Sequence, residues 1–90
     1  MTSNITVYGV NDCEDTQRAR QFLDSRGIQY QYVNLEQDKE AEEMVKREND
    51  GKRRTPLVQV CVGTQCRVLR VPSNEELENA LLDLDAIEAA

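Results

Sequence analysis

The sequence lacks histidine and tryptophan, and it contains only three cysteines, four glycines and two prolines among its 90 residues. Without histidine, neither a Ser-His-Asp triad nor a Cys-His pair can form, and most zinc sites lose a usual ligand. Long apolar runs are also absent, and the first residues, Met1 to Asn4, do not resemble a secretory signal. We therefore expect a cytoplasmic protein that does not enter a membrane and holds no metal.

Charge and cysteine content set further limits. The chain carries 11 basic and 17 acidic residues, for a net charge of −6, so its average field repels nucleic acid. The share of hydrophobic residues, 39%, suits one globular domain over residues 1–90. An odd number of cysteines excludes a framework that pairs all of them within the chain, and cytosolic cysteines are thiols by default.

Hydrophobic periodicity predicts seven elements in the order β-α-β-α-β-β-α. We expect strands at residues 5–8, 29–35, 57–62 and 66–69, and helices at residues 14–26, 39–48 and from residue 73 onward. Gly27 should stop the first helix, and Ser73 and Glu76 have the spacing of a capping box. The last helix has an apolar stripe of Leu77, Ala80, Leu81 and Leu84, and the tail beyond it should fray.

This order predicts an α/β fold with one four-stranded mixed sheet and helices on both faces. The first two strands flank a helix and should be parallel, with a right-handed crossover. The last two should form a hairpin around Gly63 and Thr64.

Cys13 follows the first strand and opens the first helix. The unpaired N–H groups and the dipole at a helix N-terminus favour a thiolate there. The alternative is a cysteine that lies in a short loop by chance.

Two motifs in this arrangement resemble those of the glutaredoxin family, over about residues 4–84. Cys13-Glu14-Asp15-Thr16 stands where that family has Cys-Pro-Tyr-Cys, or Cys-x-x-Ser in its monothiol branch, and Arg53-Arg54-Thr55-Pro56 where it has Arg-Thr-Val-Pro. The stretches Gly51 to Pro56 and Val71 to Ser73 are similar to those of mycoredoxins, a branch of the family. The resemblance implies a thioredoxin-like fold and a cis Thr55–Pro56 bond.

The first motif departs from the family pattern in two ways. Thr16 replaces the second cysteine; its hydroxyl can donate a hydrogen bond to a Cys13 thiolate but cannot attack a mixed disulfide. A dithiol mechanism within this motif is therefore excluded. Glu14 and Asp15, with Asp12 nearby, place negative charge beside the thiol, so we expect a higher Cys13 pKa than in an ordinary glutaredoxin. Glu14 and Asp15 are equally good first-turn residues of a helix.

The resemblance also implies a binding site for glutathione. Arg53 and Arg54 would contact a carboxylate, while Thr55 and Pro56 would present a backbone edge to the substrate. Ser73 and Asn74, at the start of the last helix, could hold a second carboxylate. The alternatives are a solvated basic patch and plain helix capping.

Cys61 and Cys66 should face each other if Gly63 and Thr64 form a two-residue loop. Opposed Cβ atoms lie about 4.5–5.5 Å apart, whereas a disulfide needs about 3.5–4.5 Å. We favour two buried thiols that act as small hydrophobic side chains. The alternative is a disulfide that forms under oxidation.

These observations favour a monothiol thiol–disulfide oxidoreductase that attacks glutathione-type mixed disulfides through Cys13, with Thr16 beside it. Its co-substrate would be glutathione or a similar low-molecular-weight thiol, with no bound cofactor. Its partner could be a thiol-modified protein, and we expect a monomer. The alternatives are a binding module without catalysis, whose site has decayed, and a monothiol carrier of an iron–sulfur cluster.

Overall fold

The structure is a computed structural model and describes residues 3–83. Seven elements follow the predicted order: β1 (Ser3–Gly9), α1 (Glu14–Ser25), β2 (Gln31–Asn34), α2 (Lys39–Glu48), β3 (Leu57–Val62), β4 (Gln65–Arg70) and α3 (Asn74–Asp83). β1 and β4 extend beyond their predicted ends, and β2 is shorter than the predicted 29–35. Leu84 and the tail after it lie outside the described residues. Within residues 3–83, no helix has the length and apolar character needed to span a membrane.

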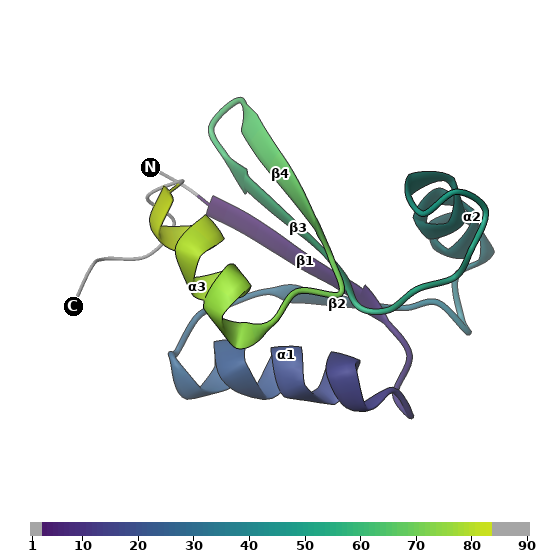
Figure 1. Cartoon of the computed structure of the whole chain (residues 1–90), viewed down its shortest axis with the longest axis horizontal. Helices are drawn as coiled ribbons and strands as arrows, with labels where there is room; N and C mark the ends of the chain where they lie inside the picture. The colour runs from purple at the N-terminus through teal and green to yellow at the C-terminus, as the bar shows by residue number, and fades with distance from the viewer. Residues whose placement is uncertain (1–2, 84–90) are drawn as a thin grey trace.

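The four strands form one sheet in the order β2-β1-β3-β4 (Figure 1). β1 runs parallel to β2 and antiparallel to β3, and β3 pairs with β4 as an antiparallel hairpin. The predicted mixed sheet and the thioredoxin-like α/β fold are therefore confirmed.

Alternation along the strands separates two apolar clusters, one on each face of the sheet. On one face, buried strand residues pack against α1 and α3: this cluster comprises Ile5, Val7, Ala19, Leu23, Val58, Val60, Leu77 and Leu81. On the other face a smaller cluster packs under α2, and it comprises Leu35, Ala41, Val45 and Leu57. Figure 1 shows α2 well apart from α1 and α3. Full burial of one such side chain contributes about 1.5–3 kcal/mol, so both clusters stabilise the sheet substantially.

Local signals end and begin the helices as predicted. Gly27, just after α1, has a φ of +66°, which glycine adopts readily. The capping box of α3 is present: the Glu76 N–H donates to Ser73 Oγ, and the Ser73 N–H donates to Glu76 Oε1, both at 3.1 Å. α2 has a cap that the sequence analysis did not identify, because the Asp38 side chain accepts from the Ala41 N–H at 3.0 Å.

Cys61 and Cys66 are opposite each other, as the predicted register requires, but they form a disulfide with a Cα–Cα distance of 4.0 Å. The preferred prediction of two buried thiols is wrong. Cys61 is half-buried and Cys66 is exposed, because the small cluster under α2 does not include this end of the hairpin. Opposed residues that share no ladder hydrogen bonds approach most closely, and this brings the two sulfur atoms within bonding reach.

Candidate thiol site

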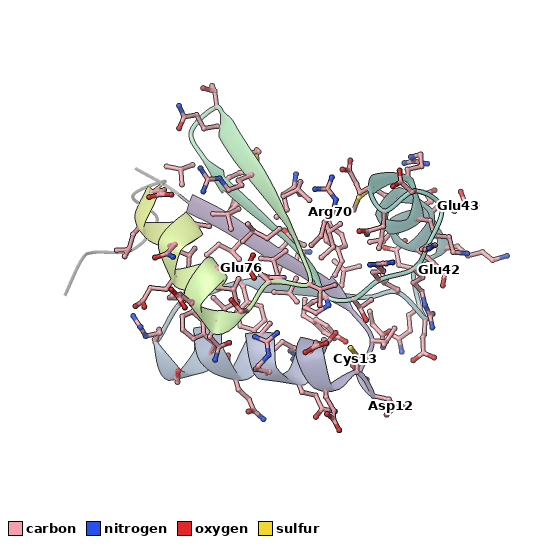
Figure 2. All side chains as sticks on the ribbon, in the orientation of Figure 1. Asp12, Cys13, Glu42, Glu43, Arg70 and Glu76 are labelled. Carbon is pink, nitrogen blue, oxygen red and sulfur yellow. A yellow bond between two sulfur atoms is a disulfide. The ribbon has the colours of Figure 1, made fainter. Side chains whose placement is uncertain are left out.

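Cys13 is the N-cap residue of α1, at the end of the loop that follows β1. Its N–H donates to the Val10 carbonyl at 3.2 Å, and its carbonyl accepts from the Gln17 N–H at 3.0 Å. The side chain is half-buried and lies at the first turn of the helix (Figure 2). The backbone therefore holds a partly accessible sulfur at the positive end of a helix of 12 residues.

The loop before β3 meets Cys13 at this point. The Cys13 Sγ atom lies 3.6 Å from the Thr55 carbonyl oxygen, and the Thr55–Pro56 peptide bond is cis, as predicted. The antiparallel pairing of β1 with β3 explains the meeting: Tyr8 is opposite Leu57, so the loop after β1 and the loop before β3 lie at the same end of these two strands. The structure thus brings together Cys13, Thr55 and Pro56, which are far apart in the sequence.

Opposing effects act on the Cys13 thiol. Burial raises its pKa, but the hydrogen bonds that the Thr55 and Thr16 side chains and the Thr16 and Asp15 backbone can offer to a charged sulfur favour the thiolate. Together these groups leave the pKa of Cys13 below its ordinary value. The lowered pKa increases the fraction of the nucleophilic thiolate near neutral pH.

Thr16 is fully buried between Cys13 and the end of β1. Its Oγ1 atom has no hydrogen-bond partner among the described residues, so the hydroxyl is available to a charged sulfur. The fit requires a glycine at position 9, since a Cβ atom there would lie 2.5 Å from Thr16 Cγ2 and 2.6 Å from Thr16 Oγ1. Sequence reasoning missed this role of Gly9, although a glycine inside a strand often marks a close approach of this kind.

The acidic residues around Cys13 are partly compensated by Arg18. Its guanidinium lies 3.5 Å from the Asp15 carboxylate. It also donates to Asn74 Oδ1 at 2.7 Å and to the Pro72 carbonyl at 2.8 Å. Arg18 therefore ties the first turns of α1 to the start of α3 while it balances the charge of Asp15. Sequence reasoning missed Arg18; the i,i+3 spacing of Asp15 and Arg18 was the only local signal.

The two arginines predicted to bind a carboxylate occupy different surroundings. Arg53 donates to Glu42 Oε2 of α2 at 3.1 Å, so its charge is already paired. Arg54 lines a surface hollow together with Lys52 and Arg70. Arg70 is held by the Glu48 carbonyl at 2.8 Å and by the Glu48 carboxylate at 3.1 Å.

Ser73 and Asn74 line a second hollow, beside the first turn of α1. The capping box already occupies the Ser73 and Glu76 N–H groups. Hydrogen bonds from Ser73 lower the pKa of Glu76, whose carboxylate thus stands at this helix end. Asp15 lines the same hollow. Arg18 lines this hollow too, so a ligand carboxylate would meet two negative charges and one positive charge here. The hollow beside Arg54 also contains Glu48 and Asp50, but its three basic residues outnumber them, which makes it the more favourable of the two.

Tyr32 and Arg20 support the loop that precedes Cys13. The Tyr32 hydroxyl donates to Asn11 Oδ1 at 2.7 Å, and Gln17 Nε2 donates to the Asn11 carbonyl at 2.7 Å. The Arg20 guanidinium lies over the Tyr32 ring at 3.9 Å. These contacts fix Asn11 through both its side chain and its backbone, and they therefore help to fix the loop that leads to Cys13.

A family model of glutaredoxin matches residues 5–67, a stretch that includes Cys13, Thr55 and Pro56. The chain belongs to the glutaredoxin family. It is 39% identical to mycoredoxin 1 of Corynebacterium glutamicum over 62 residues, which is 69% of this chain and 76% of that protein.

Solved structures agree on the fold of this glutaredoxin-family chain. The glutaredoxin-like NrdH-redoxin of Escherichia coli superposes with a TM-score of 0.61 over 97% of both chains, at 21% identity. A glutaredoxin from Archaeoglobus fulgidus superposes with a TM-score of 0.60 over 87% of this chain and 85% of that one, at 18% identity. Glutaredoxins are redox proteins that act with low-molecular-weight thiols and protein disulfides, so the surroundings of Cys13 are the place to look for chemistry in this chain.

Proposed function

We propose that this protein is a monothiol thiol–disulfide oxidoreductase that acts through Cys13 on mixed disulfides of glutathione-type low-molecular-weight thiols. One observation carries the proposal: Cys13 is a partly accessible helix N-cap whose thiolate is favoured by neighbouring hydroxyl and N–H groups. The family membership supports a redox role, and Thr16 in place of a second cysteine limits the motif to one reactive sulfur.

The cycle has two exchange steps. The Cys13 thiolate attacks the glutathione-type sulfur of a mixed disulfide, the old S–S bond breaks, and the target leaves as a thiolate that takes a proton. A second molecule of the low-molecular-weight thiol then attacks the Cys13 mixed disulfide as its thiolate. Cys13 is released as a thiolate, and the small thiols leave as their disulfide. A cytoplasmic location, where such thiols are kept reduced, fits this cycle.

Residues around Cys13 have distinct parts in this cycle. Thr16 and Thr55 stabilise the thiolate as nucleophile and again as leaving group. The Thr55 carbonyl accepts from the Cys13 thiol at 3.6 Å, and the Thr55 backbone, next to Pro56, would offer a docking edge to the substrate once the thiol is deprotonated. Arg54 would bind a carboxylate of the small thiol in the hollow that it lines, with Arg53 in support if it leaves Glu42. Ser73 and Asn74 would contact the substrate from the other hollow, which they line.

Turnover of a glutathione mixed disulfide by purified protein tests the proposal. We expect glutathione-dependent reduction that is nearly unchanged in the Cys61→Ser/Cys66→Ser double variant and is lost when Cys13→Ser is added to that variant. Arg54→Ala should raise the KM for the mixed disulfide more than it lowers kcat, because it removes a binding contact remote from the sulfur. Absence of any turnover that depends on Cys13 would refute catalysis and leave a thioredoxin-fold binding module.

A further inference from the structure

The Cys61–Cys66 disulfide lies outside the Cys13 site. On the strands, Cys61 is opposite Asn4, whereas Leu57, next to Pro56, is opposite Tyr8. Four strand residues correspond to about 13 Å along the sheet, so Cys13 cannot exchange with this pair without a large rearrangement. Figure 1 shows the turn of the β3–β4 hairpin projecting away from both α1 and α2.

The two sulfur-bearing residues differ in exposure. Cys66 is exposed on the edge strand β4, whereas Cys61 is half-buried on the inner strand β3. Two neighbours of Cys61 on the same face of the sheet are polar: Asn4 of β1 is exposed, and Gln59 of β3 is half-buried. Thiol exchange requires an in-line approach to one sulfur and a second sulfur that can leave. Cys66 is the more exposed residue of the two, so an external thiol would attack its sulfur, and Cys61 would be the leaving sulfur.

We infer that Cys61 and Cys66 form a second thiol–disulfide couple, independent of Cys13, in which Cys66 exchanges with external thiols and Cys61 resolves. In reduction, an external thiolate attacks Cys66 Sγ and Cys61 leaves as a thiolate that takes a proton. A second external thiol then releases Cys66 and forms an external disulfide. In oxidation, the Cys66 thiolate attacks an external disulfide and expels one thiol. Cys61 then attacks Cys66 Sγ and expels the other, so two electrons pass to the external disulfide.

This pair supplies what the Cys13 motif lacks, a resolving cysteine next to the exchanging one. The consequence is that Cys66 should hold an external thiol only briefly when Cys61 is present. The hairpin register fixes the two residues opposite each other in the reduced form as well, since the strands pair on both sides of them. Reduced and oxidised forms can therefore interconvert without refolding of the sheet.

A redox titration of Cys13→Ser tests the inference without any contribution from the proposed active site. The folded variant is equilibrated in buffers of different reduced-to-oxidised glutathione ratio, quenched in acid, alkylated under denaturing conditions and weighed intact. We expect both remaining cysteines to be alkylated at the reducing end and neither at the oxidising end, in one two-electron transition. A disulfide that stays closed in excess dithiothreitol would overturn the inference, as would thiols that never pair in oxidised glutathione.

A matched pair of variants assigns the two roles. Cys13→Ser/Cys61→Ser retains Cys66 alone, and Cys13→Ser/Cys66→Ser retains Cys61 alone. With oxidised glutathione, we expect Cys66 to accumulate a stable glutathione adduct on the order of ten times faster than Cys61, because the attack requires access. Equal rates, or faster modification of Cys61, would overturn the assignment of Cys66 as the exchanging sulfur. Thermal unfolding of both variants identifies any loss of the fold, and the titration above does not depend on either variant.

Discussion

Replacement of Thr16 by valine separates the chemical role of its hydroxyl from its packing role. Valine keeps the shape of the buried side chain against Gly9 and removes only the oxygen. A hydrogen bond to a charged group contributes about 1.5–3 kcal/mol, and one pKa unit corresponds to about 1.4 kcal/mol. Three other interactions also favour the thiolate, from the Thr55 side chain and the Thr16 and Asp15 backbone. We therefore expect Thr16→Val to raise the Cys13 pKa by about one unit, the lower end of that range.

The same substitution should change the pH dependence of stability. The Cys13 pKa is lower in the folded chain than in the unfolded one, so the thiolate stabilises the fold fully above the unfolded-state pKa. That contribution is lost as the pH falls through the folded-state pKa. Below it, the Thr16 hydroxyl is a buried group without a partner, which costs about 1–3 kcal/mol. Thr16→Val should therefore be at least as stable as the wild type near pH 5 and lose this advantage towards pH 9.

The assay combines two measurements in the Cys61→Ser/Cys66→Ser background, where Cys13 is the only thiol. The alkylation rate of Cys13 against pH gives its pKa, and urea unfolding at several pH values gives stability. Thr16→Ser is the matched control: it keeps the hydroxyl and loses a methyl group, so it should preserve the pKa and destabilise by about 1 kcal/mol. The reasoning is refuted if Thr16→Val leaves the Cys13 pKa unchanged, or if Thr16→Ser shifts it equally.

Substitutions at three further positions, Gly9, Val71 and Arg18, test other parts of the structure. Gly9→Ala should destabilise the fold by about 1–3 kcal/mol in urea unfolding, because its Cβ would lie 2.5 Å from Thr16 Cγ2. Adding Thr16→Ala to that variant removes the atom that is too close and should recover part of the lost stability. Val71 has a φ of +46°, so Val71→Asn should stabilise by about 1 kcal/mol, whereas Val71→Ile, the control, should bring no gain in the same unfolding assay. Arg18→Lys should weaken the contacts to α3 and leave the charge of Asp15 less well compensated. We therefore expect a higher Cys13 pKa in the alkylation assay and a KM that rises more than kcat falls. An unchanged pKa and KM would refute this positioning role.

Much of the fold could be predicted because each long element carries its own periodic signal. The bounds of α2 and β3 agree with the prediction, and the capping box at Ser73 and Glu76 is formed. The prediction for β2 was too long because the extent of an edge strand depends on its partner. Within the predicted range 29–35, only residues 31–34 pair with β1. The length of β2 is therefore set by its pairing with β1, and the alternation of apolar residues in the sequence does not indicate where that pairing ends.

The candidate site was predictable where local motifs carry it and unpredictable where distant side chains meet. Cys13 and Pro56 stand in short motifs, so their surroundings could be inferred from the resemblance. The contacts of Arg18 with Pro72 and Asn74 join residues more than fifty positions apart, and no pattern in one sequence indicates them. The prediction that Cys61 and Cys66 are two buried thiols failed for a related reason. Their register was predicted correctly, but their exposure depends on how far the apolar cluster under α2 extends.

The pH dependence of Cys13 alkylation in the Cys61→Ser/Cys66→Ser protein tests the central claim most directly. If Cys13 is the reactive sulfur of a monothiol oxidoreductase, the pH at which its alkylation rate is half-maximal must lie below the ordinary thiol pKa of about 8.5. The same protein should then form a mixed disulfide with oxidised glutathione at neutral pH and release it on addition of reduced glutathione. A midpoint at or above the ordinary value, with no such adduct, would contradict the account.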